Sequence, residues 1–145
     1  MRFAMIVSQF NQEVTSGLRQ GAEKFLAESG VAIQPKDVFL APGAFEMPLL
    51  AKKLAQTGKY AGVICLGCVI KGDTAHFEFI SLGATVGIMT ASLETETPIT
   101  FGILTTYTDE QAVVRSRNDA HNKGREAASA CLESAKILGR ILADA

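Results

Sequence analysis

The sequence contains no tryptophan, only two tyrosines and three cysteines, and no excess of charge of either sign. Lys plus Arg number 14 and Asp plus Glu number 15, a balance that argues against a general nucleic-acid binder. No apolar run approaches the roughly 20 residues of a membrane span, and no basic, apolar leader follows Met1. An odd number of cysteines fits a reducing compartment better than a disulfide framework. We therefore expect a cytoplasmic protein with neither nucleic-acid nor membrane partners.

The chain of 145 residues suits one globular domain, because 48% of it is apolar and only 20% is charged. Apolar β-rich runs alternate with segments of helical period, and residues 61–70 carry no charge, as a central strand buried on both faces would. Strands are predicted over residues 3–7, 37–41, 61–70 and 99–105. Helices are predicted over residues 12–28, 47–57, 76–94, 109–117 and 123–143. This alternation, with no linker or repeat, predicts a single α/β domain over residues 1–145, a flavodoxin-like three-layer α/β/α sandwich with a four-stranded parallel sheet.

Ligands of open α/β sheets bind beyond the carboxyl ends of the strands. Those ends lead here into loops at residues 8–11, 42–46, 71–76 and 105–106, which should open on one edge of the sheet. The loop at 72–74 precedes a helix, and the free N–H groups of a helix start favour an anion. Thr74 suits a cap whose hydroxyl could also reach a phosphate, and an ordinary capped helix start is the alternative. The Walker A and GxGxxG patterns are both missing.

Three side chains near this edge have two interpretations each. His76, in the first turn of a helix, should be a neutral ring that accepts a proton, or else a solvated histidine without a catalytic duty. His121 lies in a polar stretch and is expected at the surface. Phe10 could stack on a planar ligand or staple the start of the following helix, and Glu46 could cap a helix or bind ligand hydroxyls.

The cysteines and three basic residues are the other groups that could carry a function. Cys65 and Cys68 match CxxC, but residues i and i+3 of a strand point to opposite faces, so we expect two packed core thiols. A metal site is equally unsupported, because no second ligand cluster occurs. Arg115, Arg117 and Lys123 place positive charge near the short helix, as a solvated face or as an anion site.

The motifs PGAFEMP at residues 42–48 and GCVIKGDTAHFE at residues 67–78 occur in order with SQFN at 8–11, FGILTT at 101–106 and NKG at 122–124. Over essentially its whole length the chain resembles the 6,7-dimethyl-8-ribityllumazine synthase family. The resemblance implies a transferase of riboflavin biosynthesis that condenses 5-amino-6-(D-ribitylamino)uracil with 3,4-dihydroxy-2-butanone 4-phosphate, releasing phosphate and water, with no metal or organic cofactor. It also implies a homo-oligomer built from pentamers, with active sites between subunits, and riboflavin synthase as a candidate partner.

The same resemblance implies a role for each matched residue. Phe10 would stack on the pyrimidine, His76 would shuttle protons, and Phe101 would reach the site from the adjacent subunit. The ribitylaminouracil would also contact Ala44, Phe45, Glu46, Cys68, Val69 and Ile70, with Glu46 on the ribityl hydroxyls. The phosphate of the second substrate would bind Asp73, Thr74 and Arg115, with Lys123 near the same site.

The sequence departs from the family pattern in two places. Lys71 stands where many members have arginine, and Asp73 puts a carboxylate beside the expected phosphate site. Residues 116–121 lack the glycines of capsid-forming members and no N-terminal extension is present, so we expect a free pentamer and not a 60-subunit shell. A non-catalytic lumazine or flavin carrier would not need His76 or Arg115, an FMN-binding flavodoxin-like domain would not explain both motifs, and a related riboflavin synthase is the enzymatic alternative.

Overall fold

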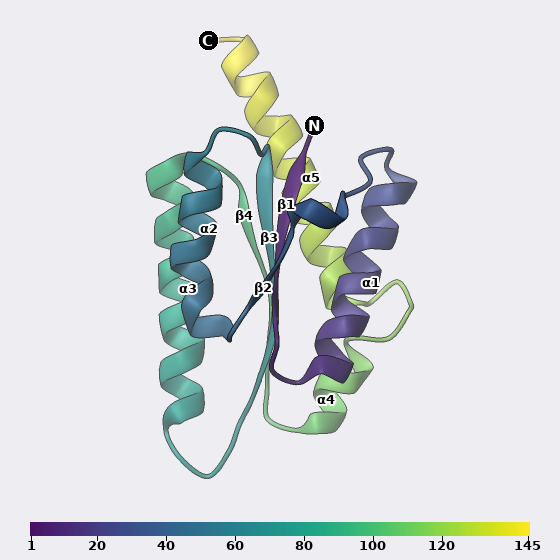
Figure 1. Ribbon diagram of the computed structural model, residues 1–145, viewed down its shortest axis with the longest axis vertical. Helices are drawn as coiled ribbons and strands as arrows, with labels where there is room; N and C mark the ends of the chain where they lie inside the picture. The colour runs from purple at the N-terminus through teal and green to yellow at the C-terminus, as the bar shows by residue number, and fades with distance from the viewer.

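The computed structural model describes residues 1–145, and its four strands form one parallel sheet in the order β2-β1-β3-β4 (Figure 1). The strands are β1 (Phe3–Ser8), β2 (Val38–Ala41), β3 (Gly62–Ile70) and β4 (Ile99–Thr106). The α-helices are α1 (Gln12–Glu28), α2 (Met47–Gln56), α3 (His76–Thr95), α4 (Asp109–Val114) and α5 (Lys123–Ala143), with short 3-10 turns at Pro35–Asp37 and Ala44–Glu46. This strand order is the flavodoxin-like one, so the predicted fold class is confirmed.

The helices form two layers because successive side chains of a strand point to opposite faces of the sheet. Phe3, Met5 and Val7 of β1 belong to a core cluster with α1, α4 and α5, whereas Ala4 and Ile6 belong to a second cluster with α2 and α3. Figure 1 shows these two groups of helices on either side of the sheet. The structure has no helix with both the length and the apolar character that crossing a membrane requires.

The structure corrects the predicted start of β2. Asp37 is not the first strand residue but the last residue of the 3-10 turn, and its side chain is 1% exposed. Its carboxylate accepts hydrogen bonds from Arg2 Nε at 2.9 Å and Arg2 Nη2 at 2.7 Å, and from the Tyr60 hydroxyl at 2.9 Å. We call these three residues the N-terminal clasp. The Arg2 guanidinium holds the pKa of the Asp37 carboxyl below its usual range.

Other boundaries shift by one to three residues. The helix predicted at 109–117 ends at Val114, because the N–H of Ser116 turns back to the carbonyl oxygen of Val113 at 3.1 Å. The strand predicted from residue 61 begins at Gly62, and the N–H of Ala61 bonds instead to the carbonyl oxygen of Arg2 at 2.7 Å. None of these shifts moves a loop away from the carboxyl edge of the sheet.

Candidate active site

The first cavity opens at the carboxyl ends of β1, β2 and β3, beside the start of α3, and its volume is about 660 Å³. We call it the central cavity. It brings together eight of the residues predicted for the site, which are distant in sequence but share this edge of the sheet. These eight are Phe10, Ala44, Phe45, Glu46, Cys68, Val69, Ile70 and His76. Ser8, Asn11, Pro42, Gly43 and Ile80 complete its lining.

Phe10 and Glu46 lie at one end of this cavity, close to Gly43. The Phe10 ring and the Glu46 Oε1 atom lie 3.2 and 3.3 Å from the position that a Cβ on Gly43 would take. Phe10 is 66% exposed, so its ring does not staple α1 but presents an open aromatic surface. Glu46 occupies the N-cap position of α2, yet its carboxylate makes no capping hydrogen bond. Both side chains are therefore free to contact a ligand.

The loop carrying Phe10 is fixed to the neighbouring strand. Asn11 adopts a left-handed conformation with φ 54°, and its side-chain N–H donates to the carbonyl oxygen of Cys68 at 3.0 Å. The N–H of Phe10 donates to Ser8 Oγ at 3.2 Å. Residues at the ends of β1 and β3 are thus held together beneath the cavity, and the Phe10 ring projects from a fixed backbone.

His76 is the first residue of α3 and lines the central cavity, with no hydrogen bond from its imidazole to the chain. The prediction that Thr74 caps this helix is wrong, because the N-cap position is Ala75 and no side chain caps it. The Thr74 hydroxyl instead accepts a 3.4 Å bond from the N–H of His76. Thr74 lies one residue before the N-cap position, and both Thr74 and Asp73 are exposed.

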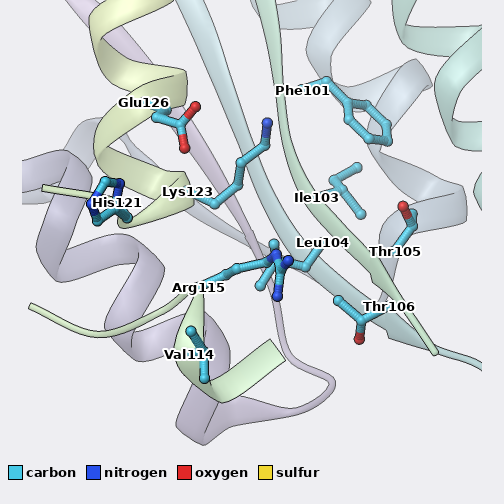
Figure 2. A pocket seen from close by; sticks show the side chains of 10 residues that line it. All are labelled: Phe101, Ile103, Leu104, Thr105, Thr106, Val114, Arg115, His121, Lys123 and Glu126. Atoms are coloured by element: carbon cyan, nitrogen blue, oxygen red, sulfur yellow. The ribbon is translucent and has the colours of Figure 1, made fainter. Parts of the chain in front are cut away.

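The second cavity lies along the edge strand β4 and has a volume of about 510 Å³. We call it the edge cavity. It holds three further predicted site residues, Phe101, Arg115 and Lys123, together with His121 and Glu126 (Figure 2). Arg115 Nη1 donates to the carbonyl oxygen of Gln111 at 3.0 Å, which ties the guanidinium to the end of α4. One chain therefore divides the predicted site between two cavities, and Asp73 and Thr74 line neither.

Comparison with known proteins decides the family. A family model described as 6,7-dimethyl-8-ribityllumazine synthase matches residues 1–139. The chain is 65% identical over 140 residues to 6,7-dimethyl-8-ribityllumazine synthase 1 of Caulobacter vibrioides, covering 97% of this chain and 92% of that protein. It is 46% identical to the 6,7-dimethyl-8-ribityllumazine synthase of Salinibacter ruber and 45% identical to that of Deinococcus radiodurans, each over 97% of this chain and 90% or 91% of the relative.

The chain belongs to the 6,7-dimethyl-8-ribityllumazine synthase family. The predicted family and the predicted class of enzyme, a synthase of riboflavin biosynthesis, are both confirmed. The roles of individual residues stay predictions. Two residues that line the edge cavity, His121 and Glu126, are not among the predicted site residues. Their closeness in sequence to Lys123 was the only signal that could have pointed to them.

The cysteines are packed as predicted. Cys65 belongs to the core cluster with α2 and α3, and Cys68 to the cluster with α1 and α5, so the two thiols lie on opposite faces of the sheet. Burial raises the pKa of Cys68 to about 11 and that of Cys131 to about 12. Thiols with such pKa values stay protonated at neutral pH, which leaves them without a nucleophilic role.

Lys71 and Asp73, which depart from the family pattern, are both exposed on the loop between β3 and α3. The Lys71 ammonium lies 5.6 Å from the centroid of the Tyr107 ring, a cation–π contact, and the N–H of Lys71 donates to the carbonyl oxygen of Thr106 at 2.9 Å. The Lys71 ammonium therefore lies beside Tyr107, the residue that follows β4. The Asp73 carboxylate makes no ion pair within the chain.

Proposed function

We propose that this chain condenses 5-amino-6-(D-ribitylamino)uracil with 3,4-dihydroxy-2-butanone 4-phosphate to give 6,7-dimethyl-8-ribityllumazine. The uracil amine attacks the ketone carbon, and loss of water leaves an imine. The phosphate ester then breaks and inorganic phosphate leaves, and ring closure with loss of a second water forms the pyrazine ring. The observation that carries the proposal is the gathering of Phe10, Glu46 and His76 around one cavity in a chain that matches the synthase family over residues 1–139.

The central cavity suits the flat, polyhydroxylated substrate. Its open aromatic surface, Phe10, would stack on the pyrimidine, and the uncapped carboxylate of Glu46 would accept hydrogen bonds from the ribityl hydroxyls. The remaining contacts would come from Ala44 and Phe45 on one side and from the end of β3 on the other. That end comprises Cys68, Val69 and Ile70.

His76 would move protons between the reacting amine, the carbonyl oxygen and water. Holding two reactants in line removes about 7–11 kcal/mol of an activation barrier, whereas one acid–base group contributes about 10²- to 10⁴-fold in rate. An amine adds to a ketone with little activation, so positioning by the cavity accounts for most of the rate enhancement and His76 for the smaller part.

The phosphate of the second substrate would bind where the first turn of α3 offers free N–H groups, at Asp73 and Thr74. Asp73 would contribute its backbone N–H, because its carboxylate lies at the surface. Arg115 supplies a planar fork suited to phosphate, and Lys123 a second cation. Since these two cations line a different cavity of the same chain, they would reach the phosphate from a neighbouring subunit, and Phe101 would reach the ribitylaminouracil from there too.

A homopentamer is proposed for this assembly, and α3 supports it with an exposed apolar stripe. Phe79, Leu82, Val86, Met89 and Leu93 are 56–71% exposed. They recur at steps of three and four residues, the spacing of a seam that packs against another helix. A helix that is apolar on its buried and its outer face needs a partner surface on both sides.

The cytoplasm is the proposed location, since the substrates are metabolites of riboflavin biosynthesis.

Mixing the purified protein with both substrates tests this function. We expect the fluorescence of the lumazine product to appear together with one equivalent of released phosphate. Binding of the lumazine or of riboflavin without turnover would indicate a carrier and contradict the proposal. Consumption of added lumazine with formation of riboflavin would instead indicate a riboflavin synthase.

A further inference from the structure

Asn122 is a polar side chain that is almost completely buried, 1% exposed, at the junction between the α4–α5 loop and α5. Its Nδ2 atom donates two hydrogen bonds, to the carbonyl oxygen of Gly17 at 3.0 Å and to that of Arg117 at 2.8 Å. Its Oδ1 atom accepts a bond from the N–H of Arg125 at 3.0 Å. One amide therefore joins α1, the loop and the first turn of α5.

The backbones of α1 and α5 lie very close to this amide and to each other. A Cβ on Gly21 of α1 would overlap the Asn122 amide, and a Cβ on Gly124 of α5 would overlap the backbone of Leu18. The two helices thus approach each other through glycines at the level of Asn122, and the amide occupies the space between them. Close packing therefore holds the amide in place together with its hydrogen bonds.

The same loop carries the cations of the edge cavity at its two ends. The N–H of Lys123 donates to the carbonyl oxygen of Arg115 at 2.9 Å, and the N–H of Asn122 to that of Asp119 at 3.3 Å. These bonds close residues 115–123 into a tight loop, which Asn122 fastens to α1. Both cationic side chains consequently enter one cavity, as Figure 2 shows for Arg115 and Lys123.

We propose that Asn122 is a positioning residue for the phosphate-bearing substrate. The proposal rests on the function proposed above, and Asn122 itself lines neither cavity, so it would act through Arg115 and Lys123. Its amide sets the spacing between the Arg115 guanidinium and the Lys123 ammonium, so that both reach one phosphate dianion. Charge-assisted bonds to phosphate depend on geometry, and a misplacement of about 1 Å can cost 10²-fold in activity.

The substitution Asn122→Ser tests this role, because serine keeps a capping oxygen for α5, but its single O–H on a shorter side chain cannot replace both amide bonds to Gly17 and Arg117. The expected result is a rise of about tenfold or more in the KM for the butanone phosphate, with the KM for the ribitylaminouracil within about twofold. The inhibition constant of inorganic phosphate should rise in parallel. A lowered melting temperature with both KM values unchanged would make Asn122 a purely structural residue and overturn the proposal.

Two further variants keep the test decisive. Asp37→Asn weakens the N-terminal clasp, whose hydrogen bonds involve no residue of this loop, and should lower the melting temperature while leaving both KM values unchanged. If Asn122→Ser does not fold, Gly21→Ala displaces the same amide without removing it, and an unchanged KM for the butanone phosphate there would refute the proposal. If the wild-type protein forms no lumazine, the proposed function fails. Calorimetric binding of inorganic phosphate to wild type and variants still measures whether Asn122 organises the anion site.

Discussion

Subunits with complementary defects can reveal whether the central and edge cavities form one active site. Glu46 lines only the central cavity and Arg115 only the edge cavity of the same chain. Glu46→Ala removes an acceptor for the ribityl hydroxyls, and Arg115→Ala removes the fork for phosphate. Loss of hydrogen bonds to a charged group costs about 1.5–3 kcal/mol, which corresponds to roughly 10- to 150-fold in activity at low substrate concentration.

The expected recovery follows from the symmetry of a ring. Suppose that each site joins the central cavity of one subunit to the edge cavity of the next. In an equal mixture, half of the subunits carry Arg115→Ala and keep an intact central cavity. Half of these are followed by a Glu46→Ala subunit, whose edge cavity is intact, so about one quarter of the sites are complete. Unfolding the two variants together, refolding the mixture and measuring lumazine fluorescence should therefore give about a quarter of wild-type activity.

A matched mixture controls for refolding. Glu46→Ala refolded with Phe10→Ala leaves every site with a defect in its central half, so no recovery is expected. If the mixture of Glu46→Ala and Arg115→Ala gives only the average of the two separate activities, each active site lies within one subunit. The division of the site between neighbouring chains would then be refuted.

Three more predictions follow from particular contacts. His76→Ala should lower kcat by about 10²-fold, the lower end for an acid–base group, because no residue orients its imidazole; complete loss of turnover with both substrates still bound would contradict this. Met89→Lys places a charge in the exposed stripe of α3 and should give smaller particles by sedimentation, whereas an unchanged sedimentation coefficient would exclude α3 from the subunit contact. The lowered pKa of Asp37 adds stability above the ordinary aspartate pKa of about 3.9, and this contribution is lost as the pH falls further. The difference in unfolding free energy between wild type and Asp37→Asn, about 1–3 kcal/mol at neutral pH, should therefore shrink below about pH 4 in urea titrations, and a constant difference would refute it.

Much of the fold could be predicted because burial leaves a strong pattern in the sequence. All residues of β1 are buried, as is most of β3, and such strands read as uninterrupted apolar runs. Helices α1, α2 and α5 are amphipathic, and Gly30 and Gly58 follow the first two, so their positions could be predicted within a few residues. The predicted boundaries are wrong where a contact with a residue distant in sequence determines the local structure. Asp37 lies outside β2 because Arg2 and Tyr60 bind its carboxylate.

The candidate site could be predicted only in part, for a topological reason. The motifs identify the residues that gather at the carboxyl ends of β1, β2 and β3. They do not show that β4 lies at the edge of the sheet, so that Phe101 and Arg115 line a separate cavity. Asn122 was recognised only as part of a motif, because its burial and its bond to Gly17 depend on how α1 packs against α5.

The placement of the sulfur atoms has a practical consequence. Cys65, Cys68 and Cys131 are all free and all buried, and burial raises the pKa of each thiol. Maleimide dyes react with accessible thiolates, so the native surface should stay unlabelled. A single cysteine introduced on an exposed turn, such as at Lys59, would then carry one fluorophore at a known position. Energy transfer between labelled subunits could follow their exchange in real time.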